Sequence, residues 1–487
     1  MRSGAVTLFS QGLKFLISVA TTMVLARLLT PSDYGLMGMV VILTGFVGLF
    51  RDLGLSTATI QRADINHRQV TTLFWLNATL GFATALLTCL AAPAIAWFYH
   101  EPRLIAIAAT LSTTFVLGGF TMQHQALLRR QMRFPALAVI DITALLAGMA
   151  TGIGLAAAGA RHWALVSAQI AIALTTLLAA WMACPWRPGW PQRNVGAKSM
   201  VMFGANITGA NLVNYFARNL DNALIGRYWG ATPLGLYSKA YQLLLLPLDQ
   251  INTPVTSVAV PVLSRIAGEP EAYRRAYRRM LQLLTLVTVP GMAFLIAAAD
   301  WVVAIVLGPQ WAEVSPIFMC LAASAPALVV CDTTGWLFVT QGRTNDMLKW
   351  TAIGVPLIVA GIVAGLAWGP IGVAISYSAT ILLLVAPLLF WFASRKGPIK
   401  QRDFYDALTP LLLPSLALMA TVTAVRNWGH MGPVGSLFTA LPIGAIAFLA
   451  VLIVFPRGRE ILADLKHFRH LLKGREAWSD SSAGASA

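Results

Sequence analysis

The chain has 487 residues, of which 57% are hydrophobic and only 11% are charged, and its mean hydropathy is +0.70. Soluble domains carry roughly 25% charged residues, so this composition excludes a soluble globular protein and indicates a polytopic membrane protein. The net charge of +16 does not predict a nucleic-acid partner, because the basic residues are placed as membrane topology requires.

Apolar stretches of about 20 residues, long enough to cross the hydrocarbon core of a bilayer, recur along the chain. They predict an all-α polytopic membrane protein with about fourteen transmembrane helices. The first stretch is longer than the apolar region of a secretory signal, so we expect it to be retained. The predicted helices lie near residues 5–28, 36–58, 71–98, 104–124, 136–158, 162–183, 200–226, 234–260, 280–299, 314–340, 348–367, 371–393, 407–425 and 434–455.

The basic residues alternate between the two sides of these predicted spans. If the N-terminus is cytoplasmic, most Lys and Arg side chains fall in inside segments, where membrane proteins carry an excess of positive charge. We therefore predict that both termini are cytoplasmic. The outside segments hold only Arg27, Arg103, Arg161, Arg227 and Arg426.

Two short segments suggest an internal repeat. Residues 26–37 and 226–237 align at an offset of 200, which places Arg27, Gly35 and Leu36 opposite identical residue types. An even number of predicted helices separates the segments, so orientation is preserved. We predict two parallel repeats related by an axis along the membrane normal, an arrangement of secondary transporters whose site lies at the repeat interface. Chance similarity of short turns is the alternative.

The repeat predicts the domain organisation. Residues 1–198 would form a lobe of six helices, residues 199–400 a second lobe of six, and residues 401–456 two extra helices. A central cavity would separate the lobes. Residues 457–487 would form an amphipathic cytoplasmic tail on anionic lipid. The arginine-rich segment 264–279 fits an amphipathic helix along the cytoplasmic surface.

The seventh predicted helix carries a polar stripe at helical spacing. Ionisable groups in hydrocarbon are costly and normally face a protein interior or a water-filled pathway. An ion pair between Arg218 and Asp221 that fixes helix packing is the alternative explanation. The stripe consists of Asn211, Asn214, Arg218, Asp221 and Asn222.

The first predicted helix carries a matching stripe, in which Gln11 and Lys14 lie opposite Asn211 and Asn214 at the same offset. Two helices with polar faces are what a cavity between two bundles requires. Cations in such a cavity favour a cargo with phosphate or carboxylate groups, because a guanidinium can donate two parallel hydrogen bonds. We predict substrate binding by Lys14, Arg51, Arg218, Gln11, Asn211, Asn214 and Asn222.

Other charged residues lie within the predicted spans. Arg51 either lines the cavity or extends to the cytoplasmic surface, and Lys239 is expected to extend to the outer surface. Asp141 is expected to pair or to support helix packing. The candidates for pairing, or for binding a coupling ion or proton, are Asp52, Asp221, Asp249 and Asp332.

The sequence gives no indication of catalysis or of a bound cofactor. It contains no G-x-x-x-x-G-K-[ST] run, so ATP hydrolysis is not predicted. Its four cysteines lack the spacing of metal or redox sites. We predict no catalytic residue, no metal and no cofactor; an ion gradient, the membrane potential or consumption of the cargo would drive transport.

Several segments resemble a known family. They are ARLLTPSDYGLMGMV (26–40), FRDLGLSTATIQR (50–62), QALLRRQMRF (125–134) and, within 218–247, RNLDNALIGRYWG and LGLYSKAYQLLLLP. These segments are similar to bacterial polysaccharide transporters, the Wzx-like lipid-linked oligosaccharide flippases of the multidrug/oligosaccharidyl-lipid/polysaccharide exporter superfamily. The resemblance covers about the first 400 residues.

The resemblance implies alternating access by two six-helix lobes in the bacterial inner membrane. A cationic cavity would receive the pyrophosphate and glycan of an undecaprenyl-linked unit used for lipopolysaccharide, capsule or exopolysaccharide. Membrane lipids and the polysaccharide polymerase machinery are the implied partners. The family segments fall on residues 51–54 and 218–222 without establishing which side chains touch substrate, whereas Lys14 rests on its position alone.

Two other functions remain open at this point. A drug/cation antiporter of the same superfamily would require an acidic or aromatic cavity. A membrane glycan polymerase or ligase would require a long outside loop with catalytic residues, and the predicted outside loops are all short.

Overall fold

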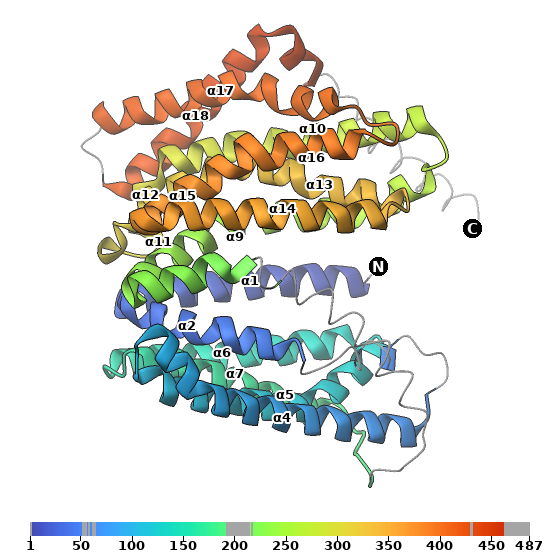
Figure 1. The fold of residues 1–487 in the computed structure, drawn as a ribbon, viewed down its shortest axis with the longest axis vertical. Coiled ribbons are helices and arrows are strands. Elements are labelled where there is room, and N and C mark those ends of the chain that lie inside the picture. Colours follow the sequence, from blue (N-terminus) through green and yellow to red (C-terminus); the bar gives the residue numbers. More distant parts are fainter. Residues whose placement is uncertain are drawn as a thin grey trace, which may run out of the picture. The chain divides into compact units, whose positions relative to one another are not determined.

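The computed structural model describes residues 2–50, 56, 59–60, 65–190, 215, 218–428 and 432–461. Every regular element in this part of the chain is a helix, which confirms the all-α prediction (Figure 1). The chain divides into two compact units. Unit 1 comprises Met1–Lys239, Val306–Val314 and Trp368–Pro370, and unit 2 comprises Ala240–Ile305, Ser315–Ala367 and Ile371–Ala487.

Unit 1 contains all the long helical segments that the structure describes before residue 231. Their bounds are α1 Arg2–Leu28, α2 Pro31–Gly48, α4 His67–Tyr99, α5 Arg103–Arg130, α6 Phe134–Ala157, α7 His162–Ala183 and a helical segment at residues 218–229. The helix α9, Ala231–Arg265, begins in unit 1 and continues into unit 2.

The remaining helices lie mainly in unit 2, apart from a short 3₁₀ turn, η1, Pro309–Trp311, that belongs to unit 1. They are α10 Pro270–Ala297, α11 Ala299–Val306, α12 Val314–Ala322, α13 Ala325–Thr340, α14 Thr344–Gly365, η2 Leu366–Trp368, α15 Gly369–Thr380, the π-helix η3 Ile381–Val385, α16 Ala386–Ser394, α17 Gln401–Trp428 and α18 Pro433–Val454.

Within the described residues, 11 helices are long and apolar enough to cross a membrane, or up to 12 if the bent pair α12 and α13 counts as one span. The segment Thr344–Ser394 counts once in that number, whereas the sequence predicts two spans there. The predicted span at 200–226 lies largely outside the described residues. The chain is thus a multi-pass membrane protein, and the total of fourteen stays a prediction.

Local sequence explains where α2 begins. Thr30 accepts a hydrogen bond from the backbone N–H of Asp33, and the Asp33 carboxylate accepts one from the backbone N–H of Thr30. This capping box satisfies N–H groups that no helical carbonyl can reach. Pro31 follows at the first helical position, where its missing N–H carries no cost.

Glycines let helices of unit 1 pack closely. α4 and α5 lie side by side (Figure 1). A Cβ atom at Gly81 would lie 2.7 Å from the carbonyl oxygen of Phe115, and one at Gly119 would lie 2.7 Å from that of Asn77. Small residues at such positions allow two backbones to approach and gain dispersion contacts.

Unit 2 contains a stack of α10, α17 and α18, in which α17 contacts both of the others (Figure 1). Buried residues of α10 such as Val289 and Ala293 join Leu418 of α17 and Phe448 of α18 in one apolar cluster. The first turns of α10 and α17 meet through ionised groups instead. This stack therefore has an apolar centre and a charged end.

The predicted surface helix at 264–279 is wrong. α9 extends to Arg265, and α10 starts at Pro270 and continues without a break to Ala297. Pro270 favours a helix start, and no helix breaker separates Arg279 from the apolar part of α10. The arginines therefore occupy the first turns of a spanning helix.

Candidate functional site

Lys14 on α1 forms an ion pair with Asp141 on α6. The Lys14 ammonium donates a hydrogen bond of 3.0 Å to the Asp141 carboxylate. The side chains are 21% and 42% exposed, so both remain accessible at the edge of the α1–α6 contact. The pair is neutral as a whole. Lys14 is therefore not an uncompensated cation in this structure.

Arg218 and Asp221 have different surroundings. Asp221 is 4% exposed, and its carboxylate accepts hydrogen bonds from the hydroxyl of Tyr237, at 2.9 Å, and from the backbone N–H of Asn222, at 2.7 Å. Arg218 is exposed. Among the described residues, no side chain or carbonyl contacts its guanidinium, so the suggested pair with Asp221 does not form here.

The remaining predicted cavity residues are only partly accounted for. Gln11 is exposed on α1, one turn before Lys14. The amide nitrogen of Asn222 donates to Asp221 at 3.3 Å, and its buried amide oxygen has no partner within the described part of the chain. The predictions for Arg51, Asp52, Asn211 and Asn214 lie outside the described residues.

Two predicted acids lie in unit 2. Asp249 on α9 and Asp332 on α13 are both exposed. The Asp332 carboxylate accepts a hydrogen bond of 3.0 Å from the amide of Asn252, which lies three residues after Asp249 on α9. Residues three apart share one helix face, so this amide links α13 to the face of α9 that carries Asp249.

Lys239 does not extend to the membrane surface as predicted. It is 7% exposed, and its ammonium lies 4.0 Å from the ring centroid of Tyr34 on α2. A cation over an aromatic face is attracted by the ring quadrupole. The first turns of α2 and α9 pack against each other here, so α2 encloses the side chain of Lys239.

The two repeat segments contact each other reciprocally within unit 1. A Cβ atom at Gly35 would overlap the backbone carbonyl of Ala231, and one at Gly235 would overlap that of Pro31. Pro31 and Ala231 are themselves 200 positions apart, as are the two glycines. Each helix thus supplies the glycine that the equivalent backbone of the other requires.

Unit 1 also contains an open, uncharged cavity of about 550 Å³ between α2, α5 and α7, in which polar groups interrupt a mostly apolar wall. Its wall includes the hydroxyls of Thr44, Thr114 and Thr176 and the amides of Gln125 and Gln169. Each of the three hydroxyls donates to a carbonyl of its own helix, so their oxygens remain as acceptors. No motif in the sequence predicts this cavity, because its wall comes from three separated helices.

Comparison with known proteins places this arrangement in a family. A family model described as polysaccharide biosynthesis protein matches residues 24–316. The chain belongs to this family. The resemblance drawn from the sequence segments is thereby confirmed.

The relatives and a solved structure agree with that assignment. The teichuronic acid biosynthesis protein TuaB of Bacillus subtilis is 30% identical over 320 residues, which are 65% of each chain. The lipopolysaccharide biosynthesis protein WzxC of Escherichia coli is 26% identical over 409 residues, covering 82% of this chain and 81% of that one. The lipid II flippase MurJ, in an inward closed conformation, superposes with a TM-score of 0.74 at 15% identity, covering 93% of this chain and 98% of MurJ. The fold is therefore MurJ-like.

Proposed function

We propose that this protein moves a lipid-linked saccharide across the bacterial inner membrane by alternating access, for assembly of lipopolysaccharide, capsule or exopolysaccharide. The exposed side chain of Arg218, at the start of the described helical segment 218–229 of a polysaccharide biosynthesis protein, carries the proposal. A guanidinium can donate two parallel hydrogen bonds to a phosphate. The proposed lipid anchor of the cargo, undecaprenyl pyrophosphate, presents such groups.

The other polar groups would contact the cargo around this cation. Gln11 and Asn222 would offer amides to sugar hydroxyls, together with Asn211 and Asn214 of the predicted polar stripe and Arg51 of the second predicted helix. Lys14 would engage phosphate by exchanging its partner Asp141 for the cargo. Asp249 and Asp332, with Asp52 and Asp221, remain candidates for a coupling ion or for pairing.

The reciprocal glycine contact supports the proposed two-lobed organisation, with residues 1–198 and 199–400 as lobes and residues 401–456 as two extra helices. Two turns that are equivalent in the repeat also make equivalent contacts, as expected for a twofold relationship. With both termini in the cytoplasm, these turns would lie at the outer face. Their contact would then belong to the state that is closed to the outside.

The first test is depletion of the protein in its native bacterium. Lipid-linked saccharide should accumulate on the cytoplasmic side, and surface polysaccharide should fall; re-expression should restore both. Unchanged levels of both would overturn the proposal. Purified protein that joined glycans in vitro would instead support the polymerase alternative, and export of a cationic dye would support the antiporter.

The site itself is tested by Arg218→Ala. Loss of a charge-assisted contact should lower export by about 10- to 100-fold, with normal protein abundance because no described residue depends on Arg218. Arg265→Ala, which removes another exposed arginine at the end of α9, is the matched control and should export normally. Full export by Arg218→Ala at normal abundance would remove Arg218 from the site.

A further inference from the structure

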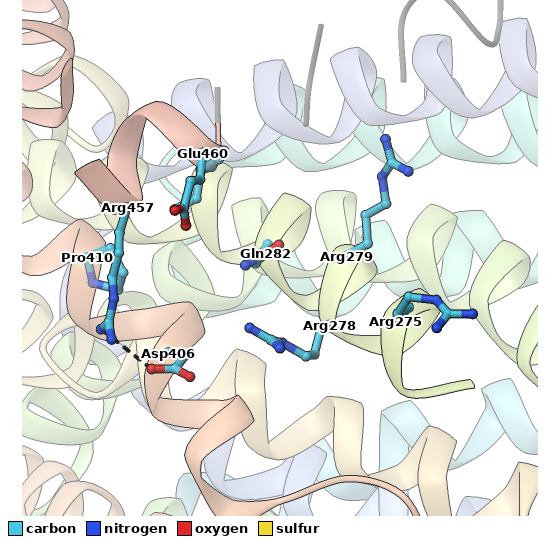
Figure 2. Close-up of a pocket in the computed structure, with 9 residues that line it drawn as sticks. Arg275, Arg278, Arg279, Gln282, Asp406, Pro410, Arg457 and Glu460 are labelled. Carbon is cyan, nitrogen blue, oxygen red and sulfur yellow. Dashed lines mark ion pairs between the residues drawn. The ribbon is translucent and has the colours of Figure 1, made fainter. Parts of the chain in front are cut away.

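A second, strongly basic cavity lies in unit 2, where α10 and α17 begin. Its volume is about 440 Å³. Figure 2 shows Arg278 and Gln282 of α10 extending toward the space beside Asp406 of α17 and Arg457, which follows α18. The complete lining is Arg275, Arg278, Arg279, Gln282, Asp406, Pro410, Arg457, Glu460 and Ile461.

The carboxylates near this cavity do not balance its arginines. The lining holds four guanidinium groups and two carboxylates. With their ion-pair partners included, the cluster holds six guanidinium groups and four carboxylates, an excess of two positive charges; the added residues are Glu271, Arg274, Arg402 and Asp403. The buried Asp403 accepts two hydrogen bonds of 2.8 Å from Arg274. Arg278 reaches it only at 3.5 Å. Arg274 and Arg278 thus share the single charge of Asp403, and these two guanidinium groups together keep one excess positive charge.

An apolar cavity of about 590 Å³ adjoins the basic one. Arg275 and Arg279 line both cavities, and residues four apart share one face of a helix. The rest of the apolar wall comes from α9 and α10, and consists of Pro254, Val255, Val258, Ala259, Ala276, Met280 and Leu283. The two cavities together suit a molecule with an anionic head and a hydrocarbon chain.

We propose that these joined cavities bind an anionic phospholipid of the surrounding leaflet. Its phosphate would lie beside the guanidinium of Arg278, in the basic cavity that Arg275 and Arg279 also line, and one acyl chain would follow the apolar wall between α9 and α10. Basic pockets between transmembrane helices recognise anionic lipid headgroups in this way. The hydrocarbon wall distinguishes this ligand from free phosphate.

Bound lipid would also strengthen the charged end of the α10–α17 contact. Arg457 lies 3.5 Å from Asp406, so α17 and the segment after α18 meet at the same cavity. A phosphate there would lower the excess positive charge of this cluster. Lipid binding is independent of which cargo the protein carries.

The experiment is native mass spectrometry of the purified full-length protein, titrated with dioleoyl phosphatidylglycerol. The wild-type protein should bind this lipid saturably, and Arg278→Gln/Arg279→Gln should bind it about 30-fold more weakly. Arg265→Gln/Arg395→Gln, which removes two arginines outside the cavity, should bind as the wild type does. Helix content by circular dichroism must match among the three proteins. If Arg278→Gln/Arg279→Gln unfolds, Val258→Asn tests the same site through its apolar wall and should also weaken lipid binding.

Competitors identify the source of the phosphate. Dioleoyl phosphatidylcholine and inorganic phosphate should not displace phosphatidylglycerol. Equal binding of phosphatidylcholine, or full displacement by inorganic phosphate, would overturn the proposal. Displacement by undecaprenyl pyrophosphate at much lower concentration would assign the site to cargo instead, and unchanged binding by both cavity variants would place the lipid elsewhere.

Discussion

The two polar faces related by the 200-residue offset use their charges in opposite ways. On α1, Lys14 is paired with Asp141 from α6, 127 residues away. In the equivalent helix, the acid is buried under Tyr237 and the cation Arg218 is exposed. At the adjoining turns, by contrast, Gly35 and Gly235 make matching contacts. The proposed repeat is therefore symmetrical where backbones touch, at Gly35 and Gly235, and asymmetrical where charges lie.

This difference follows from what each contact requires. A backbone-to-backbone approach tolerates only glycine, so both copies must keep it. An intramembrane charge requires only some partner, and each helix packs against different neighbours. Equivalent positions in a repeat thus predict shared backbone geometry better than shared chemistry.

The largest expected effect tests the symmetrical part. Gly35→Ala and Gly235→Ala should each destabilise the protein by about 2–3 kcal/mol, because the new Cβ overlaps a carbonyl that cannot move without its helix. Melting temperatures in one detergent measure this. Gly12→Ala and Gly291→Ala, which have no neighbour within 4 Å of the new atom, are the controls. A clear difference in melting temperature between Gly35→Ala and Gly235→Ala would show that the two contacts are not equivalent.

A smaller effect is expected at the Lys14–Asp141 pair. Asp141→Asn leaves an unpartnered ammonium and should cost about 2 kcal/mol, less than a fully buried pair because both groups are partly exposed. Lys14→Met/Asp141→Leu should recover most of that loss. Thermal unfolding of the single and double variants measures the interaction between the two charges. An equal loss of stability in both variants would show that the charges do not interact.

The smallest effect concerns Asp221. Tyr237→Phe removes the hydroxyl that donates to this carboxylate and should cost about 1.5 kcal/mol. Tyr405→Phe, at a more exposed ring, should be neutral. If Asp221 does not pair with Arg218, the effects of Tyr237→Phe and Arg218→Ala should add within about 0.5 kcal/mol. A larger interaction energy would restore the ion-pair explanation.

Sequence patterns predicted much of the fold because the length of an apolar stretch alone shows whether it can cross the bilayer. The helices at these stretches begin earlier than the predicted spans at 36–58 and 280–299, at Pro31 and Pro270. The pairing of Lys14 with Asp141 could not be predicted in this way, since it depends on α1 packing against α6. Lys239 was misjudged for the same reason: its distance from the membrane surface was visible, but the Tyr34 ring that encloses it was not.

The basic cavity of unit 2 likewise depends on contacts between distant helices, which sequence patterns do not show. The arginines of 274–279 are evident in the sequence, but their assignment to a surface helix ignored the continuity of α10. Asp403 and Asp406 come from a helix more than a hundred residues later. Only the folded α10–α17 contact brings Arg274 and Arg278 to the same carboxylate, that of Asp403.

The crossed glycine contact also constrains how this chain can change over generations. If the halves arose by duplication of a shorter gene, neither copy has been free to drift at this point, because each glycine serves the backbone of the other half. A side chain acquired at position 35 would be accommodated only if the backbone near position 231 moved. Mutational tolerance there is a joint property of two distant stretches of the gene.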